Sequence, residues 1–246
     1  MTAQSQTGAD LVLDGHCHLG PYPAGVVDVE GLLEEMDRNG VDRAVISPGS
    51  MEEESIEEKN DAIVSAVRAH PDRLIGLAAV DPSSRAAAGR EIQRAADEGL
   101  VGIKLRPSFS LDTDDVSPAI EAASEKRLPV YVHSGSVARH VIGDIIPIAH
   151  RHKRTPIILS YRKSPPFREN LTMEACPYSN IYFDTSSITP ANIRFLLRRL
   201  GPGRVVFGSG YPFGSQRDEL AKTRRALSTD AIPLVLHDNL ARILGI

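Results

Sequence analysis

Eight short apolar runs, each followed by a stretch with helical spacing, constrain the fold of this chain more than any other feature. The runs are rich in β-branched residues and nearly continuous, which is typical of strands that are buried on both faces. A parallel sheet covered by helices produces this pattern. The expected strands span residues 11–16, 42–48, 74–82, 101–107, 129–135, 156–161, 180–186 and 204–210.

The segments between these runs carry signals for helix ends. Asp28 is placed to cap one helix, and Gly40 stands just past its end. Pro118 and Pro190 fall where a first helical turn tolerates proline, whereas Pro147 is expected to bend or split its helix. The expected helices span residues 27–40, 55–70, 84–99, 117–127, 137–152, 189–201 and 215–228, with a weaker helical pattern over 165–180.

The order of these elements predicts an α/β fold, a single (β/α)₈ barrel. Eight strand–helix units in 246 residues give about 31 residues per unit, a typical length for one βα module. A doubly wound sheet is the competing fold, but no glycine-rich dinucleotide fingerprint follows the first strand, which leads into DGHCHLG. We expect residues 1–10 to form a flexible N-terminal segment and residues 11–246 to form one barrel domain.

Composition argues against several classes of partner. There are 28 Lys and Arg residues against 32 Asp and Glu residues, a net charge of −4, so no basic field attracts nucleic acid or anionic membrane. No apolar stretch approaches the roughly 18 to 20 residues of a membrane-spanning helix. Two cysteines cannot form a disulfide framework, and the polar N-terminus does not resemble a signal peptide. We expect a cytoplasmic protein.

Three histidines stand at expected strand ends, where barrels of this kind carry their active sites. His16 and His18 share one face of the first strand, and His133 ends the fifth strand. Three imidazoles are enough to hold a catalytic zinc that keeps a water as its fourth ligand. The pattern predicts a site for zinc or a similar divalent metal, and histidines that make only structural hydrogen bonds are the alternative.

Cationic residues cluster near other strand ends. Lys104 and Arg106 lie two residues apart on the fourth strand, and Arg162 and Lys163 follow the sixth. Arg holds carboxylate or phosphate groups through a planar fork and Lys holds them as a point charge. These residues predict binding of an anionic substrate, with Lys104 also a catalytic candidate. The alternatives are that Lys104 pairs with an interior carboxylate and that Arg162 and Lys163 are solvated loop charges.

Two carboxylates and two tyrosines complete the candidate set. Asp14 has the strand parity of His16, and Asp184 ends the seventh strand, so either could act as a base or orient an imidazole. Tyr161 ends the sixth strand as a candidate proton donor. Tyr211 borders the expected mouth and is a candidate substrate-binding residue.

Several motifs of this sequence resemble the amidohydrolase-2 branch of the amidohydrolase superfamily, which includes aminocarboxymuconate-semialdehyde decarboxylase. The resemblance covers residues 11–246, and its most specific motifs are DGHCHLG and GSGYPF, with VGIKLRP, VYVHSG and NIYFDTSS between them. It implies a barrel in which the paired histidines, the fifth-strand histidine and an eighth-strand aspartate hold one divalent metal, usually zinc. It also implies that a sixth-strand histidine assists the attacking water. Relatives of this kind are often dimeric, which raises a homodimer as an expectation.

Two positions depart from the family pattern. Gly210 stands where the family motif GSDYP has its aspartate, and Tyr161 stands at or near the place of the sixth-strand histidine. Three outcomes stay open: a metal site that uses another base, an enzyme that works without metal, or a pocket that has lost catalysis.

The resemblance favours an enzyme, a metal-dependent hydrolase or a nonoxidative lyase of the decarboxylase kind, acting on a small anionic or lactone-like substrate. In that interpretation His16, His18 and His133 hold the metal. One alternative is a catalytically degenerate barrel that binds a ligand or a partner. The other is a metal-free enzyme for cyclisation, isomerisation or dehydration, using Tyr161, Lys104 and the histidines.

Overall fold

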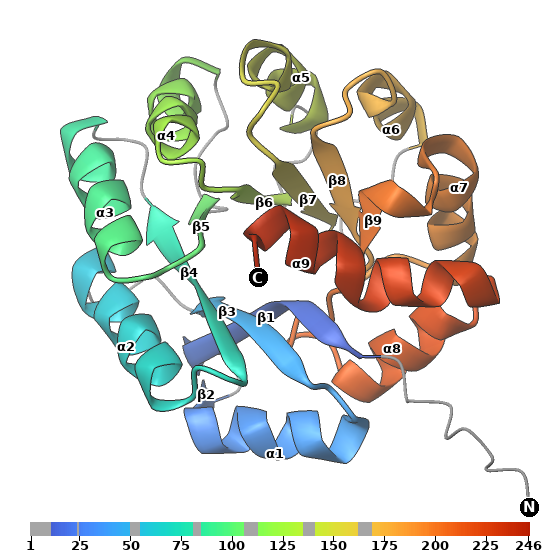
Figure 1. The fold of residues 1–246 in the computed structure, drawn as a ribbon, viewed down its shortest axis with the longest axis horizontal. Coiled ribbons are helices and arrows are strands. Elements are labelled where there is room, and N and C mark those ends of the chain that lie inside the picture. The colour runs from blue at the N-terminus through green and yellow to red at the C-terminus, as the bar shows by residue number, and fades with distance from the viewer. Residues whose placement is uncertain are drawn as a thin grey trace, which may run out of the picture.

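The structure, a computed structural model, forms a ring of strands surrounded by helices (Figure 1). It describes residues 11–23, 25–49, 55–80, 85–105, 113–134, 141–161 and 169–246. Within these ranges the side chains of residues 85, 113–116, 133, 134, 141–144, 161, 170 and 171 are not described. Residues 1–10, predicted to be a flexible segment, lie outside the described residues. No helix in the described ranges is long and apolar enough to cross a membrane.

The strands form one curled sheet in the order β2-β1-β3-β4-β5-β6-β7-β8-β9. Strand β1 pairs in parallel with β3, and from β3 to β9 each strand pairs in parallel with the next. The predicted (β/α)₈ barrel is confirmed. The strands are β1 (Leu13–Tyr22), β2 (Gly25–Val27), β3 (Arg43–Pro48), β4 (Leu74–Val80), β5 (Gly102–Leu105), β6 (Val130–Ser134), β7 (Ile157–Tyr161), β8 (Ile181–Asp184) and β9 (Val205–Val206).

The ring closes between β1 and the residues that follow β9. Gly15 N donates to Phe207 O at 2.9 Å, and Gly210 N donates to His16 O at 2.8 Å. Farther along, His18 N donates to Tyr211 O at 2.9 Å. This seam between residues 15–18 and 207–211 joins the first and eighth barrel strands, so β1 both closes the barrel and carries the paired histidines.

Helices cover the outer face of the ring (Figure 1). As the sequence predicts, the Asp28 side chain accepts a hydrogen bond from Gly31 N at the start of α1, and Gly40 ends that helix at a φ of 66°. The helices are α1 (Val29–Asn39), α2 (Ile56–Ala69), α3 (Arg85–Asp97), α4 (Thr113–Glu125), α5 (Val141–Arg151), α6 (Glu169–Ala175), α7 (Pro190–Leu200), α8 (Gln216–Arg224) and α9 (Asn239–Leu244), with short helical turns at Pro202–Arg204, Thr229–Ala231 and Leu234–Asp238.

Helix α9 lies across one end of the ring rather than on its outer face (Figure 1). Leu240 and Leu244 pack with the interior side chains Leu13, Ile75 and Tyr182 of three strands. Because these strand residues stand near the amino ends of their strands, α9 closes that end of the barrel. The carboxyl ends, at the opposite side, carry the candidate site.

Some local predictions differ from the structure. Residues 25–27, expected near a helix start, form β2, which pairs antiparallel with the end of β1. Pro118, expected in a first turn, lies inside α4, because that helix begins five residues earlier at Thr113. Pro147 lies inside α5, which continues from Val141 to Arg151 without a break. The weak helical pattern over 165–180 yields the short helix α6.

Candidate active site

The two imidazoles of β1 lie together at the carboxyl end of the strand. The register of β1 against β3 shifts between Asp14 and Cys17, and this irregularity interrupts the alternation of side chains. The ring centroids of His16 and His18 are 5.0 Å apart in an edge-to-face arrangement, and both side chains are buried. The structure therefore brings these two predicted site residues together.

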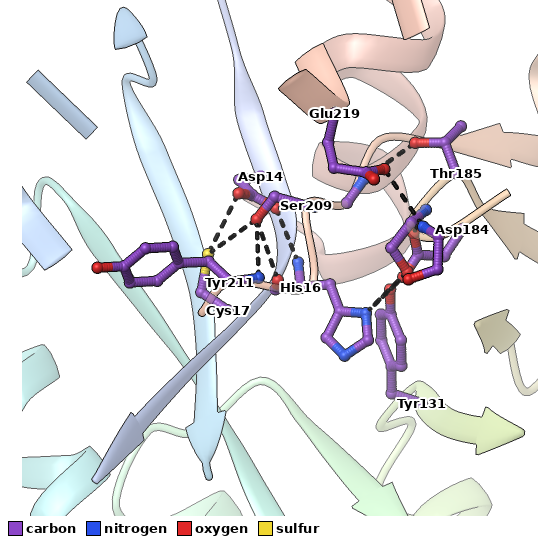
Figure 2. Close-up of polar contacts among 12 residues, drawn as sticks. Asp14, His16, Cys17, Tyr131, Asp184, Thr185, Ser209, Tyr211 and Glu219 are labelled. Atoms are coloured by element: carbon purple, nitrogen blue, oxygen red, sulfur yellow. Dashed lines mark hydrogen bonds and ion pairs between the residues drawn. The ribbon is translucent and has the colours of Figure 1, made fainter. Parts of the chain in front are cut away.

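His16 is held by the carboxylate of Asp184 (Figure 2). Nδ1 of His16 lies 2.7 Å from Oδ2 of Asp184, and the hydroxyl of Tyr131 donates to the same oxygen. The other oxygen, Oδ1, accepts from Ser186 N at 2.6 Å. Asp184 is fully buried, and its contacts come from β1, β6 and its own strand end. This network fixes the plane of the His16 ring.

Burial and hydrogen bonding shift the pKa values of both His16 and Asp184. Burial lowers the pKa of His16, and the nearby Lys104 acts in the same direction. For Asp184, burial raises the pKa, but the hydrogen bond and charge of His16 and the hydrogen bond of Tyr131 outweigh it, so its pKa is lowered overall. An ionised Asp184 therefore accepts Nδ1–H of His16, which leaves Nε2 as the ring atom that can exchange a proton.

Lys104 of β5 lies beside His18. Its Nζ atom is 3.4 Å from Nε2 and 3.5 Å from Nδ1 of His18, and donates a 3.1 Å hydrogen bond to Ser47 Oγ. Only 7% of Lys104 is exposed, and burial lowers its pKa to about 7, although the charge of Asp184 acts in the opposite direction. A lysine in this state can hold an anion or exchange a proton near neutral pH.

Asp14 lies apart from the imidazole rings. Its carboxylate accepts from Cys17 Sγ at 3.2 Å, from Gln216 Nε2 of α8 at 3.0 Å and from Ser209 N at 2.8 Å (Figure 2). The register of β1 shifts between Asp14 and Cys17, and the carboxylate of Asp14 contacts Ser209 and Gln216 instead of the imidazole of His16. Asp14 instead accepts from the backbone N of His16 at 3.1 Å and ties the seam of the barrel to α8.

Burial also determines the chemistry of the neighbouring thiol. The Sγ–H of Cys17 donates to Asp14, and Cys17 is fully buried. Burial raises the pKa of the Cys17 thiol well above its usual value, and the charge of Asp14 adds to this. Cys17 is therefore an inert thiol, although it stands between two histidines in the sequence.

Not every predicted residue joins this cluster. Tyr211 packs in the apolar core around β1 and α1, and its ring points away from the imidazole of His16 (Figure 2). For His133 and Tyr161 the structure describes the backbone alone, where β6 at His133 pairs with β7 at Ser160. The three predicted substrate-binding cations lie outside the described residues: Arg106, Arg162 and Lys163.

Tyr131 is a site residue that the sequence prediction missed. Its ring centroid lies 5.2 Å from that of His16, and Nζ of Lys104 lies 5.7 Å from the centre of the ring. Burial raises its pKa well above the usual value, and Asp184 adds to this, so the hydroxyl stays a hydrogen-bond donor. The available signal was its position two residues before His133 on the same strand.

A catalytic zinc is typically held by three protein donors and keeps a fourth position open. The described side chains contain no group of three His, Cys, Asp or Glu residues arranged to hold a metal, and β1 supplies two imidazoles. Gly210 offers no side-chain donor, and the amine of Lys104, 3.4 Å from His18 Nε2, would repel a second cation. The described side chains therefore supply two of the three predicted metal ligands. The third predicted ligand, His133, has its side chain outside them.

Several solved structures share the fold of this chain. The 5-carboxyvanillate decarboxylase of Sphingomonas paucimobilis is 20% identical, with a TM-score of 0.77 over 97% of this chain and 100% of that one. A TIM-barrel protein of Bordetella bronchiseptica is 15% identical, with a TM-score of 0.80 over 95% and 98% of the two chains. The 5-carboxyvanillate decarboxylase of Novosphingobium aromaticivorans, solved with manganese and 4-hydroxy-3-methoxy-5-nitrobenzoic acid, is 18% identical, with a TM-score of 0.76 over 96% of each chain.

These likenesses, all at low identity, establish the shared barrel fold. No curated protein sequence matches this chain. The sequence profile described as "Amidohydrolase" matches residues 13–246, which include every strand of the barrel and both histidines of β1. The chain therefore belongs to the amidohydrolase family, in its amidohydrolase-2 branch.

Proposed function

We propose that this protein is an enzyme that hydrolyses, or cleaves without redox chemistry, a small carboxylated substrate at the carboxyl ends of the barrel strands. The observation that carries the proposal is the buried cluster of His16, His18, Lys104, Asp184 and Tyr131, drawn from β1, β5, β6 and β8. Burying ionisable groups costs free energy, and their concentration in one place is typical of active sites. A barrel that only binds a partner on its outer surface would gain nothing from this cluster.

The contacts assign a role to each group. Because Asp184 accepts from Nδ1 of His16, Nε2 is the atom that would take a proton from water or substrate. Lys104, beside His18, is placed to hold the anionic group of the substrate as a point charge. Tyr131 donates to Asp184 and is a positioning residue, because it acts on the substrate only through the carboxylate that orients His16.

The proposed substrates are aromatic carboxylic acids and lactones that carry a carboxylate. Two of the similar structures are decarboxylases of 5-carboxyvanillate, and one of them holds a substituted benzoic acid. Lys104 supplies one positive charge for such a ligand, and we propose that Arg106, Arg162 and Lys163 add further charge from their strand ends. Nonoxidative loss of CO₂ and hydrolysis of a lactone both need a positioned acid or base next to a held carboxylate, which this cluster supplies.

The test is turnover of a panel of hydroxybenzoates and pyrone carboxylates, followed by CO₂ release and by the loss of ultraviolet absorbance. The wild type is expected to turn over at least one compound, and His16→Gln and Lys104→Met are expected to reduce that rate by about 10²-fold or more. His237→Gln is the matched control, because its Nδ1 lies 3.0 Å from Asp238, outside the cluster. A wild type that neither binds nor converts any compound, or a fully active His16→Gln variant, would contradict the proposal.

A second candidate is a metal-dependent hydrolase or lyase, in which His16, His18 and His133 hold zinc or manganese. The bond from His16 Nδ1 to Asp184 favours it, because histidines that bind metal commonly donate their other ring N–H to a carboxylate. A bound metal would supply Lewis-acid chemistry at Nε2 of His16. This candidate depends on His133, and metal analysis of the His133→Ala variant separates it from the first.

A further inference from the structure

Helix α8 contacts the end of strand β8 through the carboxylate of Glu219 (Figure 2). Only 14% of this side chain is exposed, and its Oε2 atom accepts a hydrogen bond from Ser187 N at 3.2 Å. Burial of a carboxylate costs free energy unless hydrogen bonds and opposite charge compensate it. Glu219 is none of the groups assigned to the reaction above, so its place beside Asp184 needs an explanation.

The turn that Glu219 contacts has an unfavourable backbone conformation. Ser186 and Ser187 form this turn, shortly after β8 ends at Asp184. Ser187 has a φ of 59°, in the left-handed region, where residues with a Cβ atom are uncommon. Such a residue keeps this conformation when the surrounding structure holds it. The hydrogen bond from Ser187 N–H to Glu219 supplies such a hold.

The same turn carries a serine that contacts both members of the His16–Asp184 pair. Ser186 is buried, its backbone N donates to Oδ1 of Asp184 at 2.6 Å, and its Oγ atom lies 3.2 Å from Nδ1 of His16. A change of backbone conformation at Ser187 would move the adjacent Ser186 and alter both contacts. The conformation of the turn therefore influences the orientation of the imidazole and the carboxylate.

A lysine of α8 holds the residue on the other side of Ser186. Lys222 pairs with Glu219, and its Nζ atom donates to Thr185 O at 3.0 Å. The positive charge of Lys222 compensates the buried carboxylate. Helix α8 thus fixes the backbone at Thr185 and at Ser187, and Ser186 lies between these two points.

We propose that Glu219 is a positioning residue for the reaction: it holds the Ser186–Ser187 turn and thereby orients the imidazole of His16. The inference rests on the proposed function, in which Nε2 of His16 exchanges a proton with water or substrate. Glu219 makes no contact with the substrate in this mechanism. Its loss is expected to slow the chemical step, because a small displacement of a proton-transferring group is costly, and to leave substrate binding near Lys104 unchanged.

The first experiment compares two substitutions of Glu219 by steady-state kinetics on the best panel substrate. Glu219→Ala removes the acceptor of Ser187 N–H and is expected to lower kcat by about 10-fold with KM unchanged. Glu219→Gln keeps an oxygen that can accept this bond and is expected to recover most of the rate. Asp218→Ala is the matched control, because Asp218 is the exposed neighbour of Glu219 on the same helix. A wild-type kcat in Glu219→Ala, or a rise in KM alone, would overturn the inference.

A substitution in the turn separates positioning from a general loss of stability. Glycine adopts a φ of 59° without strain, so Ser187→Gly makes the turn less dependent on the bond to Glu219. Added to Glu219→Ala, it is expected to restore most of the lost kcat, although the ion pair with Lys222 stays broken. If Glu219 only supported the packing of α8, kcat would stay low in the double variant, and the inference would be wrong.

The third measurement needs no substrate. A proton held between a buried imidazole and a carboxylate, such as Nδ1–H of His16, gives a downfield NMR signal, which is assigned by its absence in His16→Gln. The signal is expected in the wild type and in Asp218→Ala, and it is expected to shift or broaden in Glu219→Ala. A signal that is absent from the wild type, or that is unmoved in Glu219→Ala, would count against the proposal.

The outcomes separate this inference from the proposed function. If the wild type turns over no compound of the panel but its NMR signal moves in Glu219→Ala, the proposed function fails and the positioning of His16 by Glu219 stands. If the wild type turns over a compound and Glu219→Ala matches its kcat, the inference about Glu219 fails alone. Glu219→Met, which keeps the volume of the side chain without an acceptor, replaces Glu219→Ala in these tests if the alanine variant does not fold.

Discussion

Nδ1 of His16 and Oδ2 of Asp184 lie 2.7 Å apart, although 168 positions separate the two residues in the chain. The same oxygen accepts from Tyr131, and the other carboxylate oxygen accepts from Ser186 N. An amide at this position would turn its NH₂ group toward one of these donors, so it could not accept from all three. Asp184→Asn is expected to lower kcat by at least about 10-fold, because the tautomer and orientation of His16 are no longer fixed. The check is steady-state kinetics on the best panel substrate, and Asp238→Asn, next to His237, is the control. An unchanged kcat would refute this role of Asp184.

Gly208 should be as sensitive as Asp184 itself. A Cβ atom at Gly208 would lie 2.5 Å from Oδ1 and 2.8 Å from Oδ2 of Asp184. The carboxylate is held on three sides and cannot retreat, so Gly208→Ala is expected to displace it, to reduce activity and to cost about 1–3 kcal/mol of stability. Kinetics and thermal unfolding measure the two effects. Gly203→Ala is the control, since nothing lies within 4 Å of the added atom. If Gly208→Ala were as stable and active as this control, the packing argument would be wrong.

Two other glycines should respond in opposite directions. At Gly76 of β4 an added Cβ would clash with Leu100 Cδ2 and meet Ile63 Cγ2 at 2.9 Å, so Gly76→Ala is expected to destabilise the fold by about 1–3 kcal/mol. At Gly89 in α3 nothing lies within 4 Å, and Gly89→Ala is expected to stabilise it by about 0.4–1 kcal/mol through the unfolded chain. Chemical denaturation of both variants measures the change in the free energy of unfolding. The same change in Gly76→Ala and Gly89→Ala would contradict this packing.

Metal analysis decides between the two candidate functions. Because Gly210 offers no carboxylate ligand and the amine of Lys104 lies 3.4 Å from Nε2 of His18, protein purified without chelator or nickel is expected to hold well under one equivalent of zinc or manganese. A strong chelator is expected to leave turnover unchanged. Elemental analysis of the wild type and of His133→Ala measures this. One equivalent of metal that is lost in His133→Ala would establish the metal-dependent candidate instead.

The barrel could be predicted from the sequence because each strand is buried on both faces and therefore forms one apolar run. The residues 42–48 and 74–82, for example, contain β3 and β4 with a small error at the ends. The β1–β2 hairpin could not be predicted in this way. Strand β2 (Gly25–Val27) has three residues and pairs with the end of β1. Three residues are too few to show the alternation of apolar and polar side chains that identifies a strand.

The site was predictable where a residue type alone signals chemistry. His16, His18, Lys104 and Asp184 stand at strand ends, and the structure brings all four together. Tyr131 was missed, because an aromatic residue within an apolar strand is ordinarily assigned to the core, and its partner Asp184 lies 53 positions away in the chain.

Asp14 shows a different limit of sequence reasoning. Alternation along a strand places it on the same face as His16, but the register of β1 shifts between Asp14 and Cys17, the stretch that contains His16. Nothing in the run of residue types marks such a shift, since it is set by the pairing of β1 with its neighbours on both sides.

The candidate site depends on contacts between residues from the two ends of the chain. His16 meets Asp184 across 168 positions, and Asp14 meets Ser209 and Gln216 across 195 and 202. Contacts of such sequence separation form late in folding, because a long loop must close before they contribute. Recovery of activity during refolding should therefore coincide with the last step of barrel assembly, and no partly folded intermediate that lacks either β1 or β8 can be active.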